Sequence, residues 1–139
     1  MAQIALRKSA AYTEREVFPY VTDNEICFDL VEKAKKMAIA HNSEHPWLNM
    51  NAKEILQSAG LIETDFRTGH TGYNLAVILL FGRDEVIRSC APGYMTDAIL
   101  RVDDIDRYDD RLMVGTNLIE AYEQLWILFH ATHWTDFFL

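Results

Sequence analysis

The longest apolar run in the sequence, Leu75–Phe81, most constrains how this chain can fold. A run without a polar face must be buried on nearly every side, either as a strand or as a helix. Its β-branched content is low, and with the residues before it the run is long for a strand. Gly82 follows it, as glycine often follows a helix. We therefore predict a buried central helix over residues 71–81.

Capping signals predict two more helices. Thr22 and Glu25 have the spacing of a capping box, which begins a helix that we expect to end near His41. A second box with the same spacing begins at Asn51, and its short helix is expected to end at Gly60, where glycine suits a left-handed C-cap. The first of these helices carries apolar residues on one face and lysines on the other, which is typical of a helix that covers a core.

The other segments predict strands, loops and one longer helix. Along the chain we expect a strand over residues 3–7, a loop over 65–72, a short helix capped by Asp84, a strand over 96–102 and a helix over 117–130. The last helix carries an apolar stripe that should face the core. The stripe and its neighbours are Leu118, Ile119, Tyr122, Leu125, Trp126 and Phe129. We therefore predict an α+β fold, a helix-rich single domain with a small sheet and a buried central helix.

Composition and charge indicate a single globular domain and argue against some functions. Half of the 139 residues are apolar, which suffices for one domain with a substantial core. Thirteen basic residues against 21 acidic ones give a net charge of −8, which argues against this chain as the main DNA-contacting surface. Cys27 and Cys90 are widely separated, as is typical of reduced thiols in or near a core. With no signal peptide and no apolar run of ~20 residues, we expect a cytoplasmic protein without a membrane partner.

Several polar groups suggest a catalytic or metal site, but none completes a known pattern. The acidic turn between Asp103 and Asp110 lacks the glycine and the glutamate of a calcium loop, and its interleaved arginines are typical of a solvated turn. The histidine pairs at 41 and 45 and at 130 and 133 are spaced like zinc ligands, but a zinc site needs three or four convergent ligands. We assign no catalytic, cofactor-binding or metal-binding residue, and whether the chain belongs to an enzyme stays open.

The C-terminal residues 134–139 are strongly apolar, whereas natural chain ends are usually polar. Large exposed apolar groups mark contact surfaces. We therefore predict an interface formed by Trp134, Phe137 and Phe138, covered by another copy of the chain or by the N-terminal strand. A homodimer is one partner arrangement that such an interface suits.

Segments spread over nearly the whole chain resemble the middle of a bacterial protein family. They are residues 45–47, 54–61, 65–69, 72–82, 97–98, 106–111 and 116–119, of which 79–82 and 106–111 are the most specific. The family comprises predicted transcriptional regulators, often described as related to the ATP-dependent DNA helicase RecG. Its members carry an N-terminal Schlafen-type, AlbA-like domain and a C-terminal ATPase domain of the GHKL (histidine-kinase/gyrase) type.

The resemblance implies domain boundaries and partners. Residues 1–17 would be the terminal strand and linker of the AlbA-like domain, and residues 18–139 a connecting α+β domain before the ATPase domain. DNA would be bound by the AlbA-like domain, and ATP with magnesium by the ATPase domain, so this chain would need no cofactor of its own. Its partners would be the flanking domains of the same protein.

Two functions are open from the sequence. The first is an interdomain connector and oligomerisation module of a DNA-binding, ATP-dependent transcriptional regulator, with no catalysis of its own. The alternative is a self-contained small-molecule-binding or enzymatic domain, with a pocket near His70, Tyr73 and the turn between Asp103 and Asp110. Such a pocket should show convergent polar groups and shifted pKa values.

Overall fold

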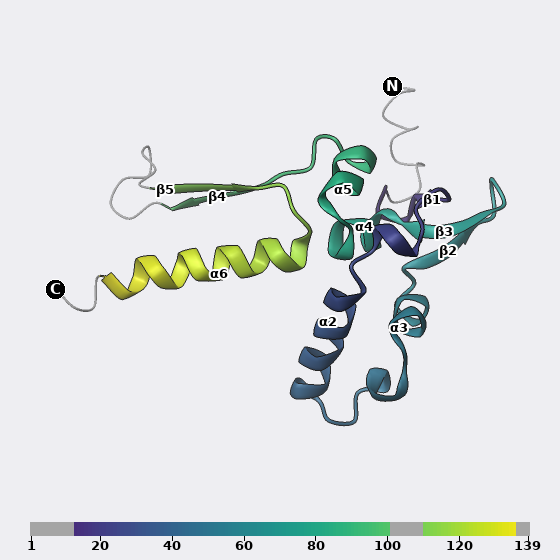
Figure 1. Cartoon of the computed structure of the whole chain (residues 1–139), viewed down its shortest axis with the longest axis horizontal. Coiled ribbons are helices and arrows are strands. Elements are labelled where there is room, and N and C mark those ends of the chain that lie inside the picture. Colours follow the sequence, from purple (N-terminus) through teal and green to yellow (C-terminus); the bar gives the residue numbers. More distant parts are fainter. Residues whose placement is uncertain (1–12, 101–109, 136–139) are drawn as a thin grey trace, which may run out of the picture.

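The computed structural model describes residues 13–100 and 110–135, which form an α+β fold, as predicted (Figure 1). A helical body packs against a three-stranded antiparallel sheet, and a two-stranded hairpin and a long helix follow it in the chain. In chain order the elements are η1 (Thr13–Arg15), β1 (Val17–Phe18), η2 (Asp23–Glu25), α2 (Phe28–His41), η3 (Pro46–Asn49), α3 (Ala52–Ser58), β2 (Ile62–Asp65), β3 (His70–Asn74), α4 (Leu75–Phe81), α5 (Asp84–Cys90), β4 (Thr96–Leu100), β5 (Asp110–Val114) and α6 (Leu118–Thr135). The strand predicted over residues 3–7 lies outside the described residues.

The predicted central helix exists, but it begins later than the sequence pattern suggests. In helix α4 the side chains of Val77 and Ile78 are fully buried. Residues 71–74, which we expected in its first turns, belong instead to strand β3. Asn74 ends this strand and caps the helix, since its Oδ1 accepts a hydrogen bond from the Val77 amide at 3.2 Å. The strand prevails over the helix here because it has a hydrogen-bonded neighbour on each side.

Strand β3 lies in the middle of the sheet, whose order is β1-β3-β2 with antiparallel neighbours throughout. Asp65 pairs with His70 beside the hairpin turn, in which Gly69 has a φ of 75° that glycine adopts without strain. The loop predicted over residues 65–72 is therefore wrong at both of its ends. The sequence did not indicate strands here because the side chains are polar. They are polar because this part of the hairpin is largely exposed to solvent.

The capping box at Thr22 is present, but it caps a single 3-10 turn rather than helix α2. The Thr22 amide donates a hydrogen bond to the Glu25 carboxylate at 2.7 Å. The chain then extends at Ile26, which forms an isolated bridge with Gly82, and α2 begins after this bridge. A long-range contact thus interrupts a helix that the local sequence alone would continue. The helix ends at His41, as predicted.

Helix α3 follows its prediction closely. The Asn51 side chain accepts a hydrogen bond from the Glu54 amide at 2.9 Å, and the Glu54 carboxylate accepts one from the Asn51 amide at 2.7 Å. Gly60, beyond the helix end, has the left-handed φ of 70° that we expected. Helix α5 also exists, but Asp84 is not its cap. Arg83 is the N-cap residue, and Asp84 contributes its negative charge to the first turn.

Gly82 is needed for a different reason from the one that the sequence suggests. Its φ is −70°, so it does not adopt the left-handed conformation of the predicted C-cap. A β-carbon at this position would overlap the backbone of Ile78, and would lie 3.1 Å from the Ile78 carbonyl carbon. Glycine therefore permits its backbone to lie close against that of Ile78, one turn earlier, at the end of helix α4.

The core lies where helices α2, α3, α4 and α5 meet the sheet. Its fully buried side chains include Val31, Leu56 and Ile87, each from a different helix. Hairpin β4–β5 and helix α6 extend from this body, and α6 contacts the body chiefly through α4 (Figure 1). Strand β4 confirms the strand expected from residue 96, whereas β5 begins in the segment that we expected to be a solvated turn.

Candidate functional site

Helix α6 presents an apolar face that the described part of the chain leaves exposed. The side chains of Tyr122, Trp126 and Phe129 have exposed fractions of 58%, 53% and 52%. The sequence therefore predicted which residues share a face of α6, but it was wrong to predict that this face is buried. Within its described part, the residue that α6 buries is Ala121. Helical spacing shows which side chains share a face, but not whether anything covers that face.

Three contacts near its start anchor helix α6 to the body. The Asn117 side chain caps the first turn, since its Oδ1 accepts a hydrogen bond from the Glu120 amide at 3.0 Å, and its Nδ2 lies 3.5 Å from the Gly82 carbonyl oxygen of the body. Ile119 packs against the core cluster. Lys33 of α2 forms an ion pair with Glu123 of α6. The aromatic residues further along the helix are therefore held on a firmly attached element that leads away from the body (Figure 1).

A groove runs between helix α6 and strand β4, with a volume of about 500 Å³. Its walls are almost entirely apolar. They are formed by Ala98, Ile99, Tyr122, Leu125, Trp126, Leu128 and Phe129. Ligand sites have similar volumes, but they also carry a few convergent polar groups. These lining side chains offer only the hydroxyl of Tyr122 and the indole N–H of Trp126, so the groove has the character of a contact surface.

Ring contacts order the aromatic side chains of α6. The rings of Tyr122 and Trp126 stack with 6.1 Å between their centroids, and His130 meets Trp126 edge-on at 4.2 Å. Stacked and edge-to-face pairs are favourable arrangements of aromatic rings. The apolar face is therefore partly preorganised, which lowers the entropy cost of covering it with a partner.

Ion pairs border the groove, and each pair is neutral as a whole. On the hairpin, Arg111 of β5 contacts Asp97 of β4 at 2.7 Å, and this hydrogen bond lowers the pKa of Asp97. On the helix, Glu123 is paired with Lys33. Pairs this exposed orient their elements more than they stabilise them. No lining residue carries a formal charge, so a partner would not have to desolvate one inside the groove.

The interface predicted at the C-terminus falls outside the described side chains. The backbone of Trp134 lies in the last turn of α6, and Phe137 and Phe138 follow the described range. Their role stays a prediction. The exposed face of α6 precedes them on the same helix. Sequence reasoning missed this face because it assigned the helical aromatic residues to the core.

The residues of the alternative pocket do not converge within the described structure. His70 is exposed and Tyr73 is buried, and their odd spacing along β3 places them on opposite faces of the sheet. The Tyr73 hydroxyl donates a hydrogen bond to Asp23, whose carboxylate also contacts Lys53 at 2.8 Å. Burial, and then the bond to Asp23, raise the pKa of Tyr73. Most of the acidic turn lies outside the described residues.

Cys27 and Cys90 are free thiols, and burial raises the pKa of each. Thiols of this kind are typical of structural rather than nucleophilic cysteines. Within residues 13–100 and 110–135, no cluster of histidine, cysteine, aspartate and glutamate side chains could hold a metal ion. Among the helices that the structure describes, none has both the length and the apolar character needed to cross a lipid bilayer.

The chain belongs to the family described as Domain of unknown function (DUF8451), whose model matches residues 3–97. The matched range contains the helical body and extends into strand β4, while β5 and α6 follow it. No curated protein matches the chain, and no solved structure does. The description of the family names no function, so the surfaces of the chain itself must support a proposal.

Proposed function

We propose that this DUF8451 chain is an interdomain connector and oligomerisation module. It belongs, in this proposal, to a cytoplasmic, DNA-binding and ATP-dependent transcriptional regulator of the RecG-related kind that its sequence resembles. An AlbA-like Schlafen domain precedes it and binds DNA, and a GHKL-type ATPase domain follows it and binds ATP with magnesium. The chain itself carries no catalysis.

The observation that supports this proposal best is the exposed aromatic face of helix α6. Its three rings are each about half exposed, and the groove beside them is apolar. Contiguous apolar surfaces on folded proteins mark sites of contact with other chains or domains. Tyrosine and tryptophan are enriched at such interfaces, because their rings bury a large area.

The first described residues and the start of helix α6 are attached to the two ends of helix α4, which suits a connector. On the N-terminal side, the amide of Leu75 donates a hydrogen bond to the carbonyl oxygen of Glu16 at 2.9 Å. On the C-terminal side, the cap residue of α6, Asn117, lies with its Nδ2 3.5 Å from the carbonyl oxygen of Gly82. A displacement of the segment around Glu16 or of the start of α6 would therefore act on the same buried helix.

The alternative function, a self-contained ligand-binding or enzymatic domain, has less support. It requires a pocket with convergent polar groups. His70 and Tyr73 point to opposite faces of β3, and the Tyr73 hydroxyl is already bonded to Asp23. The observation that favours the connector is an anchored helix with a half-exposed apolar face, and this face has no role in the alternative.

Calorimetric titration of residues 1–139 with ATP and magnesium, and separately with duplex DNA, tests the assignment of activities. The proposal expects no appreciable heat of binding from either ligand, because both sites lie in the flanking domains. Micromolar binding of ATP by this chain would contradict it. A parallel titration of the longer gene product, with both flanking domains, should show both activities.

Sedimentation velocity over a range of concentrations tests the oligomerisation. The wild-type chain should associate, whereas Tyr122→Glu should remain monomeric because it places a charge on the apolar face of α6. Phe66→Glu is the matched control: Phe66 is 94% exposed in the hairpin turn far from α6, and the substitution adds the same charge. A wild-type chain that stays a compact monomer at every concentration would overturn this part of the proposal.

A further inference from the structure

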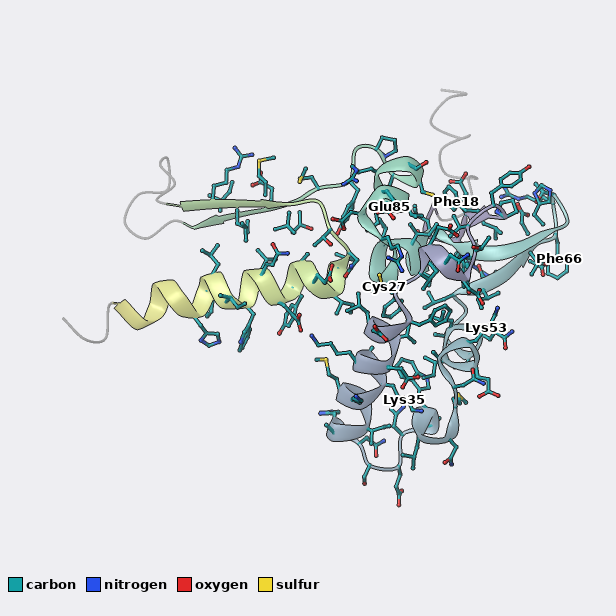
Figure 2. All side chains as sticks on the ribbon, viewed as in Figure 1. Phe18, Cys27, Lys35, Lys53, Phe66 and Glu85 are labelled. Carbon is teal, nitrogen blue, oxygen red and sulfur yellow. The ribbon has the colours of Figure 1, made fainter. Side chains whose placement is uncertain are left out.

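A second hollow lies on the body, between strand β1 with its following turn and helix α5. We call it the β1–α5 pocket, and its volume is about 420 Å³. The lining residues that matter here are Phe18, Tyr20, Glu25, Glu85, Val86 and Cys90. Figure 2 labels Phe18 of β1 and Glu85 of α5 next to each other, and both line the pocket. The volume falls in the range of small-ligand sites.

The β1–α5 pocket differs from the groove on α6 because charged side chains line it. Glu25 and Glu85 both line it, and none of its lining residues is a lysine, arginine or histidine. The hydrogen bonds from Thr22 lower the pKa of Glu25, so this carboxylate stays ionised at neutral pH. They engage one of its oxygens, Oε2. Glu85 lies in the first turn of α5 and is exposed to solvent.

Charged groups around the pocket leave it with an acidic character. Arg83 interacts electrostatically with Glu25, but its Nε donates to the Asn24 carbonyl oxygen at 2.9 Å. Glu16 adds a further negative charge, close enough to contribute to the raised pKa of Cys90. The two lining carboxylates, with Glu16 acting on Cys90, therefore give the pocket wall its acidic character.

Aromatic side chains stand beside these carboxylates. Phe18 forms part of the wall, and Tyr20 is 93% exposed at the pocket. Burying an aromatic ring stabilises a folded chain, so a ring left this exposed has its face available to a ligand. The faces of such rings attract ammonium groups, and carboxylates do so by charge. The apolar side chains of Val86 and Cys90 can cover an aliphatic stem.

From this combination we propose that the β1–α5 pocket binds an ammonium group carried on an apolar stem. The carboxylates of Glu25 and Glu85 hold the ammonium group, and Phe18, Tyr20 and Val86 cover the stem. The same chemistry is offered by a free alkylamine and by the lysine side chain of a peptide. This site is separate from the face of α6, and it does not depend on the connector function.

Titrations of the isotope-labelled full chain, followed by amide NMR shifts, test the site. The probes are pentylammonium, the neutral pentanol and the anionic pentanoate, which share one stem. Pentylammonium should give saturable shifts confined to residues 17–25 and 83–90, and pentanol and pentanoate should not. N-acetyl-lysine N-methylamide then separates the two sources. Tighter binding of this probe indicates a peptide lysine, and weaker binding indicates a free amine.

Two pairs of variants identify the groups responsible. Glu85→Gln and Tyr20→Ala should each weaken pentylammonium binding roughly two- to fivefold, as expected for one exposed charge or one cation–π contact. Glu44→Gln and Phe66→Ala are the matched controls, since both residues are exposed and lie outside the pocket, and they should leave the affinity unchanged. Thermal unfolding of each variant checks that the fold is retained.

The outcomes decide the proposal in either direction. Equal binding of pentylammonium and pentanol would show that the carboxylates play no part and would overturn it. Shifts spread over the whole surface, or an equal loss of affinity in Glu44→Gln and Glu85→Gln, would show attraction to the net negative charge rather than a site. Association of the chain through α6 is measured independently, so failure here leaves the connector proposal untouched.

Discussion

The amide of Gly82 donates a hydrogen bond to the carbonyl oxygen of Ile78 at 2.8 Å, and that oxygen occupies the place that a β-carbon on residue 82 would need. Two segments close around this point. The Cys27 amide donates to the Phe81 carbonyl oxygen at 2.7 Å, and the Arg83 amide donates to the Glu25 carbonyl oxygen at 3.0 Å. The segment that leads into α2 is thus hydrogen-bonded to the chain on both sides of Gly82, at the end of the central helix.

Gly82→Ala should destabilise the protein by roughly 1–3 kcal/mol, because the added methyl group forces a backbone shift in a packed region. Urea unfolding followed by circular dichroism measures the change. Gly93→Ala is the matched control: a β-carbon there has no atom within 4 Å, so the change should stay within about 0.5 kcal/mol. Equal effects of the two substitutions would show that the close approach at Gly82 is not required.

Two asparagine caps in different surroundings give a second prediction. Buried Asn74 caps α4 and also donates from Nδ2 to the Gly60 carbonyl oxygen at 2.9 Å, whereas Asn51 caps α3 at an exposed position. Asn74→Ala should cost roughly 2–3 kcal/mol, since it removes a cap and leaves buried polar groups without partners. Asn51→Ala should cost about 1 kcal/mol. Urea unfolding of both variants gives the comparison, and similar losses would contradict it.

The parts of the fold that the sequence predicted are those that depend on neighbouring residues. The capping boxes at Thr22 and Asn51 and the left-handed Gly60 are set by side chains within one turn, so local spacing reveals them. The start of α2 and the end of β3 are different. Each depends on pairing with a distant segment, Ile26 with Gly82 and Tyr73 with Phe18. Pairing of this kind cannot be predicted from the pattern of neighbouring residues.

The candidate site was less predictable than the fold, because exposure depends on what the rest of the chain covers. Tyr122, Trp126 and Phe129 have the spacing of a core-facing stripe, but each ring is about half exposed, and α6 contacts the body chiefly through α4. The β1–α5 pocket was not visible either, since Tyr20 and Glu85 are far apart in sequence. An acidic composition was the one sequence signal that agrees with its charge.

The bond between Tyr73 and Asp23 predicts a dependence of stability on pH. In the folded state the pKa of Tyr73 is raised, so above about pH 10 the unfolded chain loses this proton while the folded chain keeps it. The unfolded state then binds fewer protons, and stability falls as the pH rises. The stability difference between wild type and Tyr73→Phe should therefore be largest near neutral pH and shrink above pH 10.

The same difference should shrink at acid pH. The hydrogen bonds from Lys53 and Tyr73 lower the pKa of Asp23, so their contribution is present above the unfolded pKa of about 4 and is lost as the pH falls through the folded value. Urea unfolding at a series of pH values measures both limbs. Tyr20→Phe is the control, because its exposed hydroxyl should change stability by less than about 0.5 kcal/mol at each pH. A Tyr73→Phe difference independent of pH would show that the bond is absent.

Substitutions on the exposed face of α6 should have an effect on stability that depends on protein concentration, whereas substitutions in the buried core should not. Ile78→Ala removes buried methyl groups and should cost roughly 2–5 kcal/mol at any concentration. Tyr122→Ala should cost the dilute chain no more than about 1 kcal/mol, since the ring is more than half exposed there and loses chiefly its stacking on Trp126. At high concentration the wild type should gain stability from association, and this variant should not. Thermal unfolding across a concentration series measures both effects, and a large loss for Tyr122→Ala in dilute solution would show that its ring is already covered within one chain.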